Sequence, residues 1–218
     1  MEELFVTARA NDLIDPTLHI WTWEVAMYLF LGGVTAGIMI FAAAVALLKK
    51  DNVAPFASDR LAILAPIVLS MGMTTLFLDL EHKLYVYRFY TTFRVLSPMS
   101  WGAWILIIIY PVSILQILST LRRGVPQAAA YVDRIAPGRA FIDWCERYRR
   151  EISYVALPAG VLLGIYTAIL LSAFSARPFW NTGILAPLFL VSGVSTAAAL
   201  VALLTKDHGE RAWFTKVD

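Results

Sequence analysis

The chain has 218 residues, of which 59% are hydrophobic and 16% are charged, and its net charge is +2. Soluble domains average about 45–50% apolar and about 25% charged residues, and the apolar excess here is gathered in long runs without charge. This pattern excludes an ordinary soluble domain and indicates a protein whose solvent is a lipid bilayer.

Five apolar runs predict five transmembrane helices. They cover residues 21–48, 61–80, 101–121, 152–174 and 184–204, and each reaches the ~20 residues that cross a hydrocarbon core of about 30 Å. Only helices and closed barrels satisfy the backbone in lipid, and runs of this length are helical. We therefore expect an all-α integral membrane protein in which residues 21–204 form one five-helix bundle.

The segments outside these runs are short. Residues 1–20 carry four acidic residues and no basic stretch ahead of a short apolar core, so we do not expect a cleavable signal peptide. The arginine-rich segment 122–151 is expected to lie on the membrane surface as an interfacial helix, with a break at Pro137-Gly138. Residues 205–218 form a polar tail.

Lysine and arginine counts predict the orientation. Segments 1–20, 81–100 and 175–183 together hold five of the 18 basic residues, and the segments on the other side hold thirteen. The positive-inside rule then places the N-terminus outside and the C-terminus in the cytoplasm. We expect the inner (cytoplasmic) membrane of a prokaryote, with the periplasm as the outside.

Small residues predict where the helices pack closely. Gly33 and Gly37 lie four residues apart in the first run, and Gly160 and Gly164 do so in the fourth. Helices in lipid associate through close backbone approach at such positions. Packing is the simpler interpretation of both motifs.

Polar side chains of the spans gather toward the predicted outer side. Glu24 and Tyr28 lie four residues apart and share a helix face. An acidic group inside a span costs about 2.5–3.5 kcal/mol at the bilayer centre, so Glu24 is a candidate for proton exchange, unless it snorkels or pairs with an arginine. Asp79 ends the second run, Trp101 opens the third, and Tyr166 lies in the outer half of the fourth. Asp79 is equally well interpreted as a polar helix end. For Tyr166, a core aromatic whose hydroxyl bonds to a neighbour is the simpler interpretation of the residue alone.

The histidines and the cysteine argue against metal centres. His19, His82 and His208 all lie outside the runs, whereas a membrane haem needs axial ligands, usually histidine, within the bundle. Cys145 is the one cysteine, and one thiol makes no four-cysteine iron–sulfur or zinc site. We expect no haem, no bound iron–sulfur cluster and no other metal in this protein.

Several segments are familiar when taken in order. They are WEVAMYLFLGGVTAG at residues 23–37, LDL at 78–80, SPMSWGAW at 97–104, GIYTAILLS at 164–172, and the stretch 178–193. Together they resemble the NrfD/PsrC (polysulfide reductase-like) family of membrane subunits. Each motif alone has little specificity, but the resemblance covers nearly all the runs. Many members of that family have eight or more spans, which puts any proton pathway of the family in doubt here.

The resemblance implies a haem-free, quinone-reactive subunit of an oxidoreductase complex, which is not expected to catalyse a reaction alone. It implies menaquinone or ubiquinone as the bound quinone, and two partners: an iron–sulfur electron-transfer subunit and a catalytic subunit, often a molybdenum or tungsten enzyme. Glu24, Tyr28 and Tyr166 map onto the quinone pocket, with Asp79 and Trp101 beside it. Glu24 and Asp79 are the candidate catalytic groups for the protons.

The partner is expected to dock on the outer side. The segment 81–96 is the longest outer loop and carries Lys83, Arg88 and Arg94 with five aromatic residues. Arginine and aromatic residues are enriched at interfaces, although an interfacial helix among lipid headgroups fits equally well. Membrane lipid is the other expected partner, and no nucleic acid is expected.

Two other functions are compatible with the spans. A small transport or channel component would need polar residues through the full depth of the membrane, whereas the predicted inner halves are mostly aliphatic. A purely structural anchor would have no redox role and would not bind a quinone.

Overall fold

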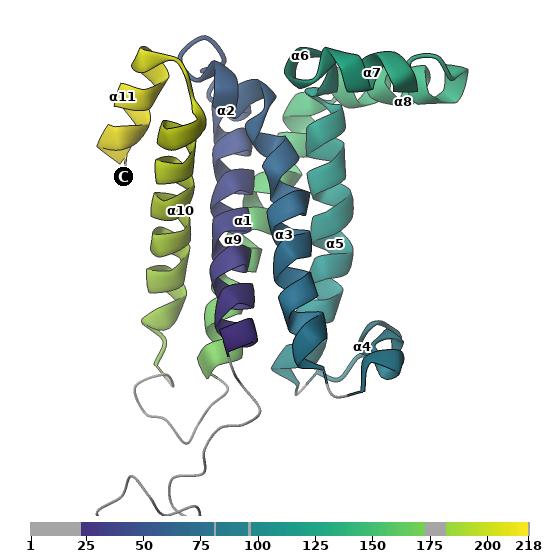
Figure 1. Cartoon of the computed structure of the whole chain (residues 1–218), viewed down its shortest axis with the longest axis vertical. Coiled ribbons are helices and arrows are strands. Elements are labelled where there is room, and N and C mark those ends of the chain that lie inside the picture. The colour runs from purple at the N-terminus through teal and green to yellow at the C-terminus, as the bar shows by residue number, and fades with distance from the viewer. Residues whose placement is uncertain (1–22, 81, 96, 173–181, 218) are drawn as a thin grey trace, which may run out of the picture.

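The computed structural model describes residues 23–80, 82–95, 97–172 and 182–217. Within these ranges five helices are long and apolar enough to cross a membrane, and this confirms the predicted number of spans (Figure 1). The predicted outer segment 1–20 lies outside the described residues, as do residues 21–22 and 173–174 of two predicted spans. The five helices are α1 (Trp23–Leu47), α3 (Leu61–Asp79), α5 (Pro98–Leu118), α9 (Arg149–Ser172) and α10 (Leu185–Leu204).

Two of these helices begin earlier than the apolar runs. α5 begins at Pro98, because proline suits the first helical turn, where its missing N–H has no helical partner to lose. α9 begins at Arg149 and includes a charged first turn that ends at Glu151. An apolar run therefore marks the part of a helix that lipid can cover, and the helix itself extends into the polar interface.

The short helices lie at the two ends of the bundle (Figure 1). The end that carries α4 is called the α4 end below, and the opposite end, which carries α11, is called the α11 end. The α4 end is the one that the charge counts place outside. The short elements are α2 (Pro55–Asp59), the 3-10 helix η1 (Lys83–Tyr85), α4 (Tyr87–Thr91), α6 (Leu121–Gly124), α7 (Pro126–Val132), α8 (Ala136–Arg147) and α11 (His208–Val217).

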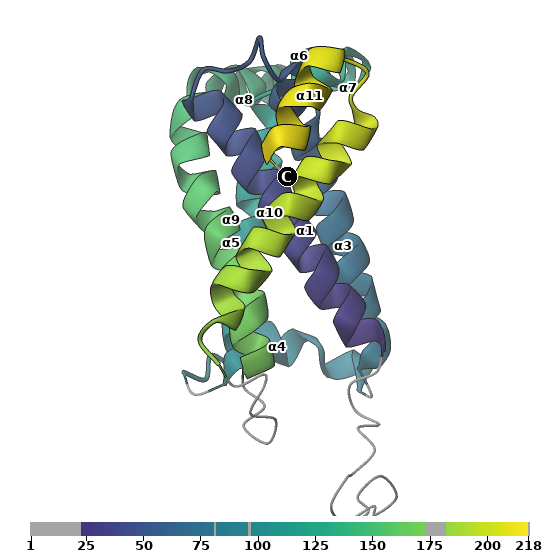
Figure 2. The same cartoon turned by 90° about the vertical axis from the view of Figure 1, so that its left-hand side faces the viewer.

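α1 is the central helix of the bundle. It packs against α3, α9 and α10, and it contributes the largest share of the buried core. Figure 2 shows α10 crossing α1 at an angle. The elements around α1 therefore have fixed positions relative to its side chains, including those near its N-terminus.

Glycines allow these close crossings. A Cβ added at Gly37 would lie 2.6 Å from the Cβ of Ala197 on α10, and one added at Gly160 would lie 3.0 Å from the carbonyl oxygen of Ala36 on α1. Gly33 faces Gly193 of α10. Both predicted glycine motifs thus lie at helix–helix contacts, as expected for helices in lipid.

The segment 122–151 folds into α6, α7 and α8 and the first residues of α9, rather than one interfacial helix (Figure 1). The break falls at Asp133–Ile135, before the predicted Pro137-Gly138, because Pro137 occupies the first turn of α8. Arg122 holds the segment together: its guanidinium lies 2.8 Å from Asp133 and 2.6 Å from Asp143. It also pairs with Glu146 at 2.9 Å.

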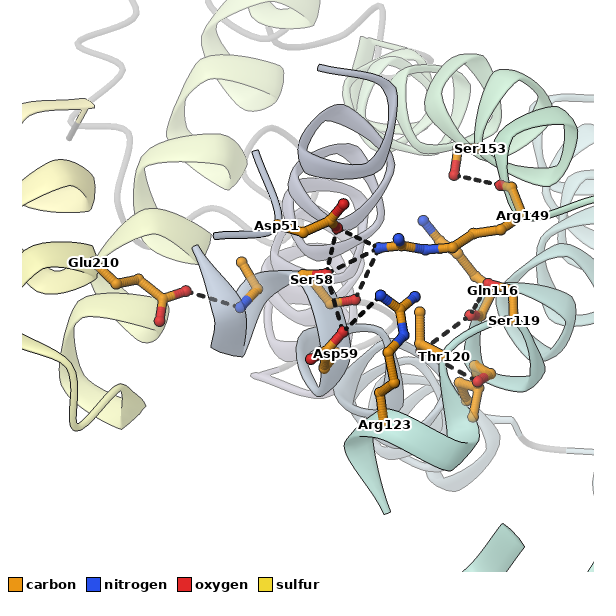
Figure 3. Close-up of polar contacts among 12 residues, drawn as sticks. Asp51, Ser58, Asp59, Gln116, Ser119, Thr120, Arg123, Arg149, Ser153 and Glu210 are labelled. Carbon is orange, nitrogen blue, oxygen red and sulfur yellow. Dashed lines mark hydrogen bonds and ion pairs between the residues drawn. The ribbon is translucent and has the colours of Figure 1, made fainter. Parts of the chain in front are cut away.

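A network of charged and hydroxyl groups closes the α11 end (Figure 3). Arg149 at the start of α9 lies 2.9 Å from Asp51 and donates to the hydroxyl of Ser58 at 2.9 Å. Ser58 in turn donates to Asp51 at 2.6 Å. Arg123 pairs with Asp59 at 3.5 Å. These bonds join the α1–α2 turn and α2 to α6 and α9.

Glu210 ties α11 to the same network. Its side chain is fully buried and accepts hydrogen bonds from the backbone N–H groups of Phe56 and Ala57, at 3.1 and 2.9 Å, in the first turn of α2. The hydroxyl of Thr205 donates to it at 2.7 Å. A carboxylate at a helix N-terminus satisfies N–H groups that the helix itself leaves unbonded, so Glu210 fixes α11 against α2.

Candidate functional site

A cavity lies toward the α4 end, between α1, α3, α5 and α9, and α4 forms part of its edge. Its volume is about 500 Å³, within the range of small-molecule sites, about 300–1,000 Å³. Most of the wall is aliphatic, aromatic or methionine side chains, and hydroxyl groups supply its polar atoms. The described residues that line it are Tyr28, Ser70, Met73, Thr74, Leu76, Phe77, Leu80, Val86, Phe89, Tyr90, Met99, Gly102, Ala103, Leu106, Tyr110, Tyr166 and Leu170.

Two of the predicted quinone-site residues meet on this wall. Tyr28 of α1 and Tyr166 of α9 are each 3% exposed, both line the cavity, and their phenol groups are close enough to interact electrostatically. Gly102 of α5 makes room for this pair, because a Cβ there would collide with the Tyr166 hydroxyl. Three helices therefore fix the position of one phenol pair.

Glu24 and Asp79 come together at the rim of the bundle rather than on the cavity wall. Glu24 lies one turn from Tyr28 on α1, and it is close enough to Asp79, the last residue of α3, for their charges to interact. Both side chains are partly buried. Oxygen Oε2 of Glu24 is buried and has no hydrogen-bond partner among the described residues.

Trp101 lies outside the described lining of the cavity. Its side chain is 47% exposed, and its indole N–H donates to the carbonyl oxygen of Val95 at 2.7 Å. The cavity-facing residues of α5 follow one helical stripe, from Met99 through Gly102 and Leu106, and Trp101 is out of phase with that stripe. Trp101 instead anchors the loop that precedes α5.

The cavity holds a second hydroxyl pair, which was not predicted from the sequence. The Ser70 hydroxyl on α3 and the Tyr110 hydroxyl on α5 lie 3.1 Å apart, and both residues line the wall. Thr74 lies one turn from Ser70 and donates to its carbonyl oxygen at 2.8 Å. Ser70 and Thr74 are spaced by four residues in an apolar run, and this spacing was the available signal for a polar stripe.

Tyr90 of α4 brings another phenol to the cavity. Burial, and then the neighbouring Tyr110, raises the pKa of Tyr90 above its ordinary value. The group therefore stays protonated at neutral pH and remains a hydrogen-bond donor. Its position shows that the short helix α4 contributes to the wall of the cavity as well as to the surface.

The predicted docking residues are exposed beside this cavity. Lys83 lies on η1, Arg88 on α4 and Arg94 in the following loop. Arg88 stacks over the ring of Tyr85, 4.5 Å from its centroid. A smaller hollow of about 290 Å³ is lined by Arg88, Phe89, Thr92, Arg94, Ser97 and Ser100. Phe89 lines both this hollow and the larger cavity, so the basic surface adjoins the cavity.

Another cavity, of about 410 Å³, lies on the other side of α1, against α9 and α10. Its described lining includes Gly33, Phe189, Ser192 and Thr196, and no ionisable or phenolic side chain. In the part of the protein that the structure describes, no three His, Cys, Asp or Glu side chains gather as a metal site would require. Because its wall carries phenol side chains, the cavity between α1, α3, α5 and α9 is the better candidate site.

Comparison with known proteins places the protein in a family. The family model described as "Polysulphide reductase, NrfD" matches residues 11–211. The sequence is 31% identical over 192 residues to the C subunit of polysulfide reductase from Wolinella succinogenes. It is 29% identical over 191 residues to protein NrfD of Escherichia coli K12.

Each of these alignments covers 85% of this protein and 59% of the relative. This protein therefore spans about three fifths of the length of the curated relatives it matches. The family match extends from before α1 into α11. It thus includes all five apolar helices and every described residue of the phenol-lined cavity. The protein belongs to the NrfD polysulphide reductase family.

Proposed function

We propose that this protein is the quinone-reactive membrane subunit of a multi-subunit oxidoreductase, and that the quinone headgroup binds in the phenol-lined cavity. The observation that carries the proposal is the pair of buried phenols, Tyr28 and Tyr166, on a mostly apolar wall. An apolar cavity with a few placed donors accepts a flat ring that has carbonyl oxygens. The family membership supports the same assignment.

The phenols and the carboxylates take different roles. Reduction of a quinone to a quinol consumes two electrons and two protons, and oxidation releases the same number. The Tyr28–Tyr166 pair donates a hydrogen bond to a carbonyl oxygen of the ring and orients it. Glu24 and Asp79, at the rim one turn away, exchange the protons with the aqueous side.

The electrons come from or go to a partner. In the proposal an iron–sulfur subunit docks on the exposed surface around Lys83, Arg88 and Arg94, which adjoins the cavity. That subunit connects the quinone to a catalytic subunit. The Wolinella relative is named as one lettered subunit of a reductase, and this supports an assembly of several polypeptides.

The proposed orientation places the α4 end in the periplasm, on the basis of the charge counts. A membrane-impermeant maleimide should label Leu84→Cys on η1 in intact spheroplasts that lack the partner subunits, because Leu84 is then highly exposed. Ala140→Cys on the exposed face of α8 should be labelled only after the membrane is opened. The reverse labelling would overturn the orientation and leave the quinone site untouched.

The direct test of the proton role is Glu24→Gln in the assembled complex. Loss of a positioned acid–base group costs typically 10²- to 10⁴-fold in rate, so we expect quinone turnover to fall by about 100-fold or more. Glu151→Gln is the matched control, because Glu151 is exposed at the opposite end of the bundle. Unchanged turnover of the Glu24→Gln complex, with its subunits intact, would remove Glu24 from the mechanism.

A further inference from the structure

A second hydroxyl pair faces the same cavity as the first. Ser70 Oγ of α3 and Tyr110 Oη of α5 lie 3.1 Å apart. Ser70 is exposed and Tyr110 is partly buried, and both belong to the cavity wall. Ser70, Thr74 and Phe77 are all exposed wall residues of α3, so the cavity opens to the protein surface along this helix.

The two pairs flank one volume. A Cβ added at Gly72 would lie 3.7 Å from the ring of Tyr28, and Ser70 is two residues away, about 3 Å along the helix axis. Tyr110 lies about 12 Å along α5 from Gly102, but helical aromatic side chains lean back toward the helix N-terminus, here toward Gly102. Tyr110 and Tyr28 are close enough to interact electrostatically.

Hydrogen counting shows what each pair can offer. Two hydroxyl groups carry two hydrogens, and the bond between them uses one. Ser70 and Tyr110 therefore retain one donor, and the phenols of Tyr28 and Tyr166 retain at least one more. A hydroxyl hydrogen that faces hydrocarbon without an acceptor is costly, so a ligand with acceptor atoms at both ends of its ring satisfies both pairs at once.

We infer that the Ser70–Tyr110 pair is the second headgroup anchor of the site. It binds the carbonyl oxygen on the side of the quinone ring opposite to the one that Tyr28 and Tyr166 bind. This inference rests on the proposed quinone function and deepens it. It assigns a positioning role to a residue pair at the lipid-facing opening, where an incoming ring first meets a donor.

The competing explanation is structural. The Ser70–Tyr110 bond joins α3 to α5, and these helices pack mainly on other neighbours, α3 on α1 and α5 on α9. A bond that only held the helices together would affect every ligand of the cavity alike. A bond that presents a donor would affect only ligands that need a second donor.

The experiment measures the binding affinity of two probes for the protein in its complex, embedded in lipid nanodiscs. Menadione is a naphthoquinone with two ring carbonyls. Tetralone is a related bicyclic ketone with one carbonyl. In Tyr110→Phe the Ser70 hydroxyl loses its partner and turns back onto a carbonyl oxygen of its own helix, so this variant should weaken menadione binding about threefold to tenfold, the loss of one neutral hydrogen bond. Tetralone needs one donor, which either pair provides, so its affinity should stay within about twofold. Ser70→Thr, which keeps the hydroxyl, should retain menadione affinity.

The controls separate this inference from the proposed function. Tyr154→Phe removes an exposed phenol outside the described lining of the cavity and should change neither affinity. Equal weakening of both probes by Tyr110→Phe would show a structural role and overturn the anchor. Weakening of menadione by Tyr166→Phe, with no effect of Tyr110→Phe, would overturn the anchor and leave the quinone site standing. Unchanged menadione affinity in both variants would remove the quinone site as well.

Discussion

The two ends of the bundle use polar groups in opposite ways. At the α11 end, charged side chains bond to one another and to backbone groups, and they hold the α1–α2 turn, α2, α6, α9 and α11 together. At the α4 end, a few hydroxyl groups sit on an apolar wall around about 500 Å³ of space. Saturated polar networks rigidify a structure, whereas partly used donors on a fixed wall bind ligands.

This contrast suggests a division of labour within one small bundle. The network fixes the helix ends on one side, and local packing sets the helix spacing around the cavity on the other. Gly102 shows how tight that spacing is, since the hydroxyl of Tyr166 occupies the space of its missing side chain. Substitutions at the α4 end should therefore change ligand binding, and substitutions at the α11 end should change the free energy of unfolding.

After the Glu24→Gln variant, the largest expected effect comes from filling the space at Gly102. Gly102→Val places side-chain atoms where the Tyr166 hydroxyl lies, so the phenol must leave its position beside Tyr28. We expect quinone turnover of the complex to fall at least about tenfold, the worth of one hydrogen bond to a ligand, while the protein still assembles. Gly183→Val is the control, because a Cβ at Gly183 meets nothing within 4 Å. Equal turnover in the two variants would contradict the described site.

A smaller effect, on stability alone, is expected at the α11 end. Arg149→Ala removes bonds to Asp51 and Ser58, and hydrogen bonds to charged groups contribute about 1.5–3 kcal/mol. We expect the free energy of unfolding in mixed micelles to fall by about 2 kcal/mol, with the affinity for quinone unchanged. Arg150→Ala, at an exposed neighbouring position, should change the free energy of unfolding by less than about 0.5 kcal/mol. A loss of quinone affinity without a loss of stability would contradict the division between the two ends.

The smallest effect is a pH dependence at the same place. Partial burial works to raise the pKa of Asp51, but hydrogen bonds from Ser58 and Arg149 and the arginine charge outweigh it and hold that pKa below its usual value. A carboxyl whose pKa is depressed by folding contributes stability above its unfolded pKa, about 3.9, and loses it as pH falls through the folded value. The stability difference between the protein and Asp51→Asn should therefore shrink from pH 7 to pH 3. A difference that stayed constant would show that the Asp51 charge plays no part.

The number of spans was predictable from sequence because lipid imposes it locally. Any helix that crosses the bilayer must carry about 20 apolar residues, and this demand is visible without knowledge of the neighbouring helices. The boundaries were less predictable, because Pro98 and Arg149 begin their helices in the polar interface, where composition no longer distinguishes a helix from a loop.

The site was predictable only in part, and the reason is helix phase. Tyr28 and Tyr166 were identified through the family resemblance, and they lie together in the structure. The Ser70–Tyr110 pair was missed because single hydroxyls in a span are common, and their meeting depends on how α3 and α5 are rotated. The same rotation takes Trp101 out of the described cavity lining. Glu24 and Asp79 lie near each other at the rim, and their proton role remains a prediction.

The network at the α11 end was missed for a different reason. Arg123, Arg149 and the basic residues near them were read as signals of orientation, which depends on their number and not on their partners. The buried carboxylate of Glu210 lies far along the sequence from Phe56 and Ala57, whose N–H groups donate to it. No local pattern connects such residues.

The most direct test of the central claim is quinone binding by the phenol pair itself. Menadione should bind to the complex in nanodiscs, and Tyr28→Phe and Tyr166→Phe should each weaken that binding about threefold to tenfold, whereas Tyr154→Phe should leave it unchanged. Binding that is equally strong in all four proteins, or no binding to the unaltered complex, would contradict the assignment of this cavity as the quinone site.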